Sequence, residues 1–303
     1  MSSRRNDVDR TLTTSGNDEL TPLRRRIRAV ASRVDRDLPW SLTRDPWAIY
    51  VSEVMLQQTS VARVLEPWRR FCDLFPTPAA CAEAPLGDVL RAWAGLGYPR
   101  RARNLQRAAQ RMVSDFDGQV PSDVEQLRSL PGVGPYTAHA VAAFAFGRRV
   151  GVVDTNVGRI LARCVTNSRL SAPRAQELST QLVGRADPAR MNQALLDLGA
   201  QFCRATPRCD SCPLRSECRW RREGGPDPAM ESAGVSRPQA RFEGSNRQAR
   251  GRLLAQLQLG TCRKAVALNI LAPDDLERAS ALLADLENEG LVSVERGRVR
   301  LGS

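Results

Sequence analysis

Apolar positions recur at helical spacing along most of this 303-residue chain. From about residue 21 to residue 220 the pattern predicts one helix after another, with short loops and no convincing series of strands. The clearest helical segments are residues 46–71, 86–96, 101–116, 123–130, 137–146 and 191–202. We therefore expect an all-α fold for the first two thirds of the chain.

Composition changes at both ends of this helical region. Residues 1–20 are polar, which predicts a disordered tail. The sequence Gly224-Gly225-Pro226-Asp227-Pro228 opens a stretch rich in Gly, Pro, Ser and Ala, and we interpret residues 223–240 as a linker. Residues 241–303 then remain as a small separate module.

The C-terminal module combines helical and strand patterns. Residues 247–257 and 273–289 have helical spacing, and Gly290 is a candidate C-cap for the second helix. Residues 291–301 alternate between apolar and polar, with a turn at residues 295–297, as in a two-stranded hairpin. Helices followed by a hairpin predict a winged-helix-like module.

Charge and targeting signals narrow the class of protein. Lys and Arg outnumber Asp and Glu by 45 to 33, giving a net charge of +12 that favours a polyanionic partner. Because solubility or a genome-wide preference for Arg gives the same excess, charge alone favours nucleic acid only modestly. The chain has no apolar run of membrane-spanning length and no secretory signal at its N-terminus. We expect a cytoplasmic protein without a membrane partner.

Four cysteines form the strongest single motif, C-x5-C-x2-C-x5-C. They are Cys203, Cys209, Cys212 and Cys218. Four thiolates on short loops suit zinc or an iron–sulfur cluster. A pair of disulfides is the alternative, and it requires an oxidising compartment. The remaining cysteines, which we expect to be small buried apolar residues, are Cys72, Cys81, Cys164 and Cys262.

A second motif joins two predicted helices through Leu-Pro-Gly-Val-Gly. Ser122 and Glu125 suggest a capping box at the start of the first helix, and Pro135 suits the first position of the second. Gly132 and Gly134, which flank Val133, permit positive φ and a close approach of the backbone to a ligand. The backbone N–H groups that begin the second helix form a phosphate site. An ordinary αα-turn is the alternative, but one glycine would suffice for it.

The order of hairpin, aspartate at a helix start and four-cysteine loop resembles the helix–hairpin–helix DNA glycosylases of the endonuclease III superfamily. Within it the chain is most similar to the MutY branch of adenine glycosylases. The matching motifs are Leu38-Pro39-Trp40, Ser52 to Thr59, Gly95-Leu96-Gly97-Tyr98, Arg101 to Leu105, Leu130 to Thr137, Asn192-Gln193-Ala194 and Asp197 to Ala200. The resemblance implies a six-helix domain at residues 46–148. It also implies an iron–sulfur cluster domain built from residues 21–45 and 149–222, which carries the catalytic aspartate.

The resemblance assigns catalytic roles to four residues. Glu53 lies in an apolar helix, where burial would keep it protonated, and its counterpart in the family protonates adenine N7. Asp154 corresponds to the carboxylate that stabilises the sugar cation, and a helix N-terminus favours its ionised form. Asn156 and Tyr136 match residues that support these carboxylates. Bifunctional relatives carry a lysine in place of Tyr136, so we expect a monofunctional enzyme.

Further residues are expected to contact DNA after the target base leaves the stack. Those that match wedge or base-contact positions of the family are Gln57, Gln58, Thr59, Leu96 and Tyr98. The hairpin contributes Gly132, Val133, Gly134 and Thr137. His139, the single histidine, is interpreted as a structural helix residue.

The expected activity is therefore removal of adenine mispaired with 8-oxoguanine or guanine in double-stranded DNA, by a nucleoid-associated monomer. The resemblance implies one [4Fe–4S] cluster on the four cysteines, although the first loop is one residue shorter than is usual in the family. Residues 241–303 are too few for the MutT-like domain of many MutY proteins, and they lack its Phe-Ser-His loop. Two alternatives stay open, a thymine or uracil mismatch glycosylase and a non-catalytic iron–sulfur protein that binds DNA or senses redox state.

Overall fold

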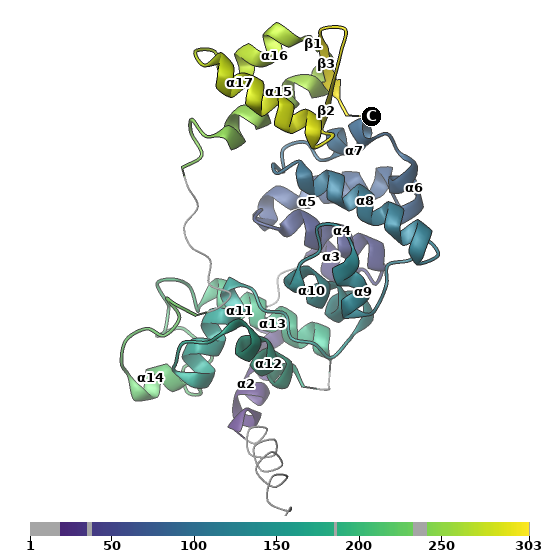
Figure 1. The fold of residues 1–303 in the computed structure, drawn as a ribbon. Coiled ribbons are helices and arrows are strands. Elements are labelled where there is room, and N and C mark those ends of the chain that lie inside the picture. The colour runs from purple at the N-terminus through teal and green to yellow at the C-terminus, as the bar shows by residue number, and fades with distance from the viewer. Residues whose placement is uncertain (1–18, 35–37, 185–186, 233–240, 303) are drawn as a thin grey trace, which may run out of the picture. The chain divides into compact units, whose positions relative to one another are not determined.

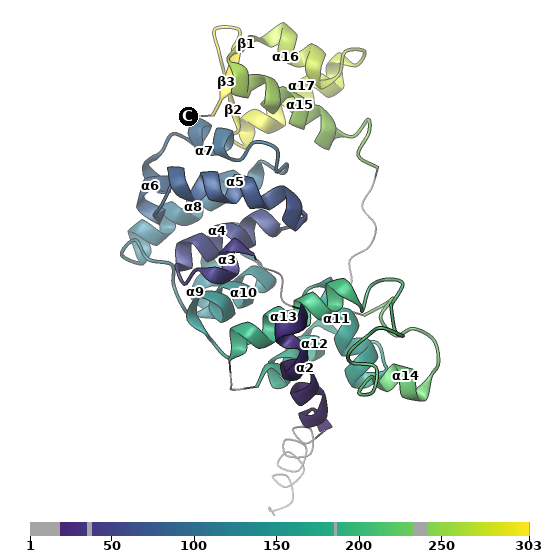
Figure 2. The same ribbon diagram turned by 180° about the vertical axis from the view of Figure 1, so that it is seen from behind.

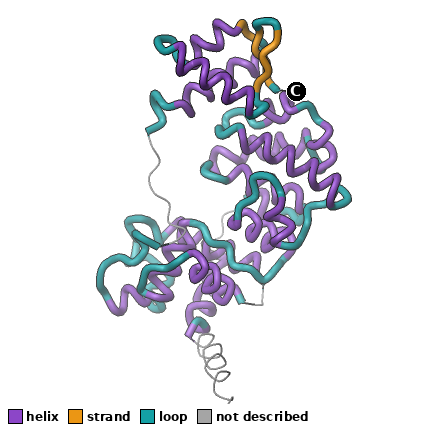
Figure 3. The backbone as a smooth tube through the Cα atoms, viewed as in Figure 1, coloured by secondary structure: helices purple, strands orange, loops and turns teal. Residues whose placement is uncertain are grey.

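The computed structural model describes residues 19–34, 38–184, 187–232 and 241–302. The described chain is mostly helical, as predicted, and its strands lie in the C-terminal part of the chain (Figures 1 and 3). It divides into two compact units, residues 1–37 with 139–237 and residues 38–138 with 238–303. The predicted disordered tail falls almost entirely outside the described residues.

The first unit is a helical domain that brings both ends of its sequence together. Its elements are α2 (Thr21–Val34), α11 (Thr155–Ile160), the π-helix η1 (Leu161–Thr166), α12 (Ala172–Val183), α13 (Pro188–Gln201) and α14 (Arg219–Glu223). Helix α2 packs against α13, and α13 also contacts α11. Ile27, Leu161 and Leu195 are fully buried at the centre of one apolar core. Burial of this shared face holds α2 against helices that are more than a hundred residues away in the sequence.

The second unit contains a helical domain and the C-terminal module. Its helical domain comprises α3 (Pro39–Leu42), α4 (Pro46–Leu56), α5 (Val61–Leu74), α6 (Pro78–Glu83), α7 (Leu86–Ala92), α8 (Arg100–Asp115) and α9 (Val124–Ser129). Helix α10 (Pro135–Phe146) begins in this unit and ends in the first.

The apolar stretch at residues 46–71 was predicted as one helical segment, and this prediction is wrong. Helix α4 ends at Leu56 and α5 begins at Val61. Gln58 has a left-handed backbone (φ 55°), and Ser60 is an extended N-cap, so no helix can continue through this loop. The interruption matters because it creates the loop that carries Gln57, Gln58 and Thr59.

The capping box predicted at Ser122 and Glu125 is also wrong. Asp123 is the N-cap of α9, and its carboxylate accepts hydrogen bonds from the backbone N–H groups of Glu125 (2.9 Å) and Gln126 (3.1 Å). Aspartate caps a helix about as well as serine does, so local preference could not separate the two adjacent residues.

The C-terminal module has a winged-helix topology. Its elements are α15 (Asn246–Leu259), β1 (Cys262–Arg263), α16 (Lys264–Leu271), α17 (Leu276–Asn288), β2 (Val292–Glu295) and β3 (Arg298–Leu301). The antiparallel sheet has the order β1-β3-β2, so β1, which was not predicted, pairs with the second strand of the predicted hairpin. Gly290 follows α17 with φ 67°, and Arg296 and Gly297 form the left-handed turn. The hairpin is confirmed, the C-cap of α17 is Glu289 with Gly290 as the left-handed residue after it, and α16 was missed.

The C-terminal module packs against α7 and α8 of the same unit. Glu289, just after α17, forms ion pairs with Arg100 of α8 and Arg250 of α15, and its carbonyl accepts a hydrogen bond from Arg103. Gly302 lies against Gly87, and the end of β3 contacts α7 (Figure 2). The buried carboxylate of Glu289 therefore links the module to the helical domain, because it pairs with arginines of both α8 and α15.

The Glu289 ion pairs predict a pH-dependent stability. Burial alone would raise the pKa of Glu289, but hydrogen bonds from Arg100 and Arg250 outweigh it and lower the pKa to about 2, from 4.5. A lowered carboxyl pKa stabilises the fold above pH 4.5, and this stabilisation is lost as the pH falls from there toward 2. Glu289→Gln should lower the unfolding free energy at pH 7 by about 2 kcal/mol, since the exposed Arg100 weakens the effect.

Denaturant unfolding at several pH values measures the Glu289 effect. The difference between wild type and Glu289→Gln should shrink toward pH 3, while Glu277→Gln, at an exposed position of α17, should behave as wild type. A difference that stayed constant across this range would show that the ion pairs do not cause the stabilisation.

Candidate functional site

The guanidinium of Arg101 forms hydrogen bonds with two loops of the second unit. Arg101 lies in the first turn of α8 and is only 9% exposed. It donates six hydrogen bonds of 2.7–3.1 Å, to the carbonyls of Val54, Met55, Gln57, Leu96 and Gly97 and to the hydroxyl of Thr59. Burial lowers the pKa of Arg101 to about 10, so it is still charged at neutral pH. The loop at residues 57–60 and the loop at residues 95–98 therefore share one rigid support.

Both loops hold a residue in a strained backbone conformation. Gln58 and Tyr98 have φ values of 55° and 48°, in the left-handed region that non-glycine residues rarely adopt. Such residues cost about 1–3 kcal/mol each, and they cluster at functional sites. Gln58 is exposed and Tyr98 partly exposed, whereas Leu96 is only 1% exposed. Leu96 thus belongs to the core and supports the loop, which differs from its predicted role as a side chain that contacts DNA.

The helix–hairpin–helix connection lies beside the first of these loops. The Gln57 side-chain amide donates to the hydroxyl of Thr137 (3.1 Å) and to the carbonyl of Gly132 (3.4 Å). Thr137 is buried at the start of α10, so its role is to connect the hairpin with the loop. The predicted DNA-contact residues of the second unit are therefore neighbours in space.

The fold places different requirements on the two glycines of the hairpin. Gly132 has φ 79°, and a Cβ there would lie 2.8 Å from the Cβ of Asn104. Gly134 does not adopt a positive φ, and among the described residues no atom lies within 4 Å of its Cβ position. Nothing in the described fold requires glycine at 134, so its exposed backbone is open to an external ligand.

Two predicted catalytic residues belong to this second unit. Glu53 is 4% exposed in α4, a helix in which nine of eleven residues are buried. Tyr136 is partly buried in the first turn of α10. Glu53 is therefore a buried carboxyl group in a largely buried helix.

The other two predicted catalytic residues belong to the first unit. Asp154 is the N-cap of α11, and its carboxylate accepts hydrogen bonds from the N–H of Val157 (2.8 Å) and the side-chain amide of Asn156 (2.7 Å). Burial raises the pKa of Asp154, against these hydrogen bonds, which lower it. This pKa shift is opposite in direction to the one predicted from the helix N-terminus alone. The cost of removing the carboxylate from water outweighs the hydrogen bonds that it accepts.

Hydrogen bonds connect Asp154 to the cysteine loop. The side-chain carbonyl of Asn156 accepts from Arg159 (2.6 Å), and Arg159 Nε also donates to the carbonyl of Cys203 (2.5 Å). Asn192 is fully buried and holds the segment before Asp154, since it binds both the N–H of Val152 and the carbonyl of Val150 at 2.9 Å. These contacts fix the position of Asp154 from both sides.

Gly199 of α13 is needed for the close approach of α11. A Cβ at position 199 would lie 2.6 Å from the Cβ and 2.7 Å from the carbonyl oxygen of Asn156. Gly199→Ala should therefore displace α11 and lower the unfolding free energy by about 1–3 kcal/mol, although alanine favours the helix. In Gly251→Ala, also within a helix but in open space, the same change should stabilise by up to about 1 kcal/mol.

Denaturant unfolding of both glycine variants tests the approach of α11. Equal effects of the two substitutions would show that Asn156 does not restrict position 199.

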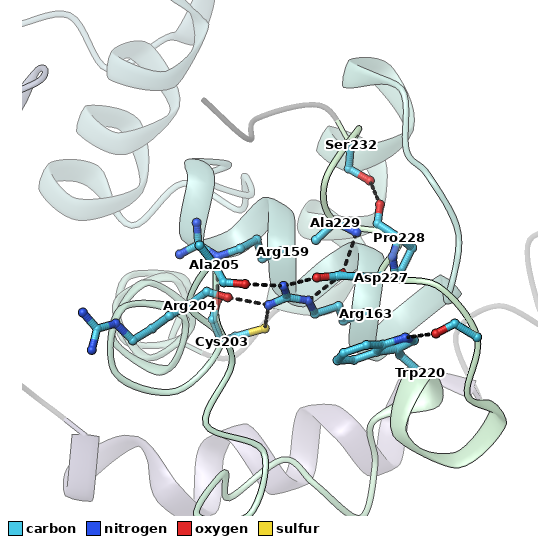
Figure 4. A network of polar contacts seen from close by, with 11 residues as sticks. Arg159, Arg163, Cys203, Arg204, Ala205, Trp220, Asp227, Pro228, Ala229 and Ser232 are labelled. Carbon is cyan, nitrogen blue, oxygen red and sulfur yellow. Dashed lines mark hydrogen bonds and ion pairs between the residues drawn. The ribbon is translucent and has the colours of Figure 1, made fainter. Parts of the chain in front are cut away.

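The four cysteines predicted as ligands line one small cavity in the first unit. Arg163 is 1% exposed and donates to the sulfur of Cys203 (3.4 Å), to the carbonyl of Arg204 (2.7 Å) and to both oxygens of Asp227 (Figure 4). Its guanidinium also lies 5.5 Å from the ring centre of Trp220. Asp227 belongs to the segment predicted as a linker, so the start of that segment packs against the cysteine loop.

A fifth thiol, Cys164, lines the same cavity and hydrogen-bonds to Cys218. This hydrogen bond lowers the pKa of Cys218 to about 6. Across the described ranges, no group of three or more His, Cys, Asp or Glu side chains is arranged to hold a metal ion. The four predicted ligands therefore line one cavity, and four thiolates are donors that suit either zinc or an iron–sulfur cluster.

Comparison with known proteins identifies the family. Residues 51–185 match the family described as the HhH-GPD superfamily base excision DNA repair protein. The chain is 47% identical over 233 residues to the adenine DNA glycosylase of Mycobacterium tuberculosis, covering 75% of each chain. It is 42% identical over 266 residues to that of Mycolicibacterium smegmatis, covering 85% of this chain and 88% of the relative. The chain belongs to the adenine DNA glycosylase family.

The fold of this adenine DNA glycosylase family member also matches solved structures. A thermostable thymine-DNA glycosylase is 27% identical, with a TM-score of 0.64 over 68% of this chain and 98% of that one. The predicted helix–hairpin–helix glycosylase fold is thereby confirmed. None of the described helices is long and apolar enough to cross a bilayer.

The sequence did not reveal three residues that organise the two parts of the site. Arg101 was noted only within a family motif, although it supports both loops of the second unit. Cys164 was expected to be a small buried apolar residue, and Asp227 was assigned to a linker. A buried arginine does not appear in the spacing of apolar positions. Only the position of Arg101 beside two glycine-rich or polar loops could have indicated its role.

Proposed function

We propose that this protein is a monofunctional DNA glycosylase that removes adenine mispaired with 8-oxoguanine or guanine. The observation that carries the proposal is the identity of 42–47% with two mycobacterial adenine DNA glycosylases over three quarters or more of the chain. The buried carboxyl groups of Glu53 and Asp154 supply the two groups that the reaction needs.

The reaction breaks the bond between adenine N9 and the sugar C1′. Glu53, in its apolar helix, donates a proton to N7, so that the base leaves as neutral adenine. Asp154 stabilises the positive charge that develops on the sugar, because a poorly solvated carboxylate acts strongly on a nearby cation. Water then bonds to C1′ and releases a proton. Asn156 orients Asp154 through its 2.7 Å hydrogen bond, and Tyr136 replaces the amine that strand cleavage would need.

The second unit supplies the contacts to double-stranded DNA. The exposed glycines Gly132 and Gly134, with the half-buried Val133 between them, bind phosphate together with the N-terminus of α10. Gln58 and Tyr98 fill the space that the extruded adenine leaves, and Gln57 and Thr59 hold their loop. The protein acts on chromosomal DNA in the cytoplasm as a monomer.

One [4Fe–4S] cluster is proposed at the cavity lined by Cys203, Cys209, Cys212 and Cys218. The cluster would supply a structural link within the cysteine loop. Arg163 donates to the Cys203 sulfur, a contact that favours a thiolate ligand. Protein purified without oxygen should show broad visible absorbance near ~400 nm and about four iron atoms per chain. A colourless protein loaded with zinc would contradict the proposal.

Duplex cleavage assays distinguish the candidate activities. The protein is incubated with labelled duplexes that contain A opposite 8-oxoguanine, A opposite G, T opposite G or U opposite G, and alkali then cleaves the abasic strand. Strand breaks only at adenine, and only after alkali, support the proposal. Breaks only at T or U would identify a mismatch glycosylase of the other specificity, and no breaks in any duplex would favour a non-catalytic protein.

A further inference from the structure

Two of the four cysteines proposed as cluster ligands are buried, and the other two are more accessible. Cys203 and Cys218 are 9% and 6% exposed, whereas Cys209 and Cys212 are half-buried. A ligand sulfur near the surface can accept hydrogen bonds from water, but a buried sulfur depends on donors that the protein supplies. The donors to Cys203 and Cys218 are therefore the groups through which the protein itself acts on the cluster.

The π-helix η1 supplies one side-chain donor to each buried sulfur. Arg163 donates to the sulfur of Cys203 at 3.4 Å (Figure 4), and the next residue, Cys164, hydrogen-bonds to the sulfur of Cys218. Arg163 and Cys164 are themselves 1% and 5% exposed, and both line the cysteine cavity. Two consecutive side chains of η1 thus point to the same cavity, in a type of helix that is rare and is frequent at functional sites.

Cys164 is the donor in its hydrogen bond with Cys218. A cysteine that binds metal is a thiolate, which carries no proton and can only accept a hydrogen bond. The proton must therefore come from Cys164, whose burial favours the neutral thiol. The sulfur of Cys218 also accepts from the backbone N–H groups of Trp220 and Arg221, so Cys164 adds a side-chain donor to two backbone donors.

The cavity holds five thiols, whereas a [4Fe–4S] cluster binds four. Cys164 could in principle be a ligand in place of Cys218. The hydrogen bond argues against this exchange, because a thiol that donates still holds the proton that a ligand must lose. Cys164 is therefore better explained as a neighbour of the cluster than as one of its ligands.

We propose that Cys164 is a positioning residue for the iron–sulfur cluster, whose S–H group donates to the Cys218 ligand and raises the reduction potential of the cluster. A reduced cluster carries one more negative charge than an oxidised one, so a donor to its sulfur stabilises the reduced form more. Arg163 acts on Cys203 in the same direction. The inference rests on the proposed cluster, and it does not depend on which base the protein removes.

The test measures the reduction potential of the full-length, cluster-loaded protein by voltammetry. Cys164→Ala removes the donor and should make one-electron reduction about three- to ten-fold less favourable, which corresponds to ~28–59 mV. Cys164→Ser places a hydroxyl donor at the same position and should restore the wild-type potential or exceed it. Cys262→Ala removes a thiol of similar burial (8% exposed) from the other unit and should leave the potential unchanged.

Iron content and visible absorbance are measured on the same samples. A lower potential in Cys164→Ala alone, with about four iron atoms per chain in both Cys164 variants, supports the inference. If the alanine variant loses its iron, full iron in Cys164→Ser still supports a donor. Equal potential shifts in both variants, or loss of iron from both, would assign Cys164 a packing role and overturn the inference.

Two further outcomes separate this inference from the proposed cluster. Cys218→Ala that keeps its iron, when Cys164→Ala does not, would make Cys164 the ligand and overturn its role as a donor. An unchanged potential in iron-loaded Cys164→Ala would overturn this inference alone. Wild-type protein that binds zinc, or no metal, would overturn the proposed cluster, and this inference with it.

Discussion

Asp154→Asn is expected to lower the rate of adenine excision by about 10³-fold or more while leaving duplex binding intact. Asparagine has nearly the shape of aspartate and caps a helix equally well, so its oxygen can keep the bond to the N–H of Val157. The lost charge is the one that, in the proposed mechanism, stabilises the sugar cation. Single-turnover cleavage of an A·G duplex and a binding isotherm for the same duplex measure the two effects separately.

The Asp154→Asn variant is also expected to stay folded. Because burial raises the pKa of Asp154, the charge costs folding free energy at neutral pH. Asp154→Asn should therefore be at least as stable as wild type, so slow excision cannot be attributed to unfolding. Asp275→Asn makes the same change at the N-cap of α17 and should retain full activity. Normal turnover by Asp154→Asn would show that another group stabilises the cation.

Much of the fold and of the candidate site could be predicted because short motifs fix local geometry. The Leu-Pro-Gly-Val-Gly segment gives a helix stop, a left-handed turn at Gly132 and a new helix start at Pro135. The alternation at residues 291–301 gave the hairpin for the same reason, since strand periodicity depends only on neighbouring residues. These features form without contacts to residues that are distant in the sequence.

Other features depend on distant contacts and could not be predicted. The break between α4 and α5 requires a left-handed Gln58, and the carbonyls of that loop are satisfied by Arg101, more than forty residues away. The raised pKa of Asp154 depends on burial by the rest of the first unit, which outweighs the local effect of the helix start. Cys164 enters the cysteine cavity from η1, and π-helices have no sequence signature.

Arg101→Met is expected to produce the largest loss of stability among the predicted variants. Methionine fills most of the space of the side chain but donates no hydrogen bond. Five buried or half-buried carbonyls and one hydroxyl would then lose a donor. Since each unsatisfied buried group costs about 1–3 kcal/mol, the unfolding free energy should fall by about 4–5 kcal/mol, the upper end for one substitution.

Arg101→Lys distinguishes hydrogen bonding from charge at this position. An ammonium group keeps the charge but cannot direct donors to both loops at once, so lysine should recover only a small part of the lost stability. Arg111→Met removes an arginine of the same helix that pairs with Asp115 at the surface, and should cost no more than about 0.5 kcal/mol. Denaturant unfolding of the three variants measures these differences. If Arg101→Met were as stable as Arg111→Met, the loops at residues 57–60 and 95–98 would have to be held by other contacts, and the strain at Gln58 and Tyr98 would lack its support.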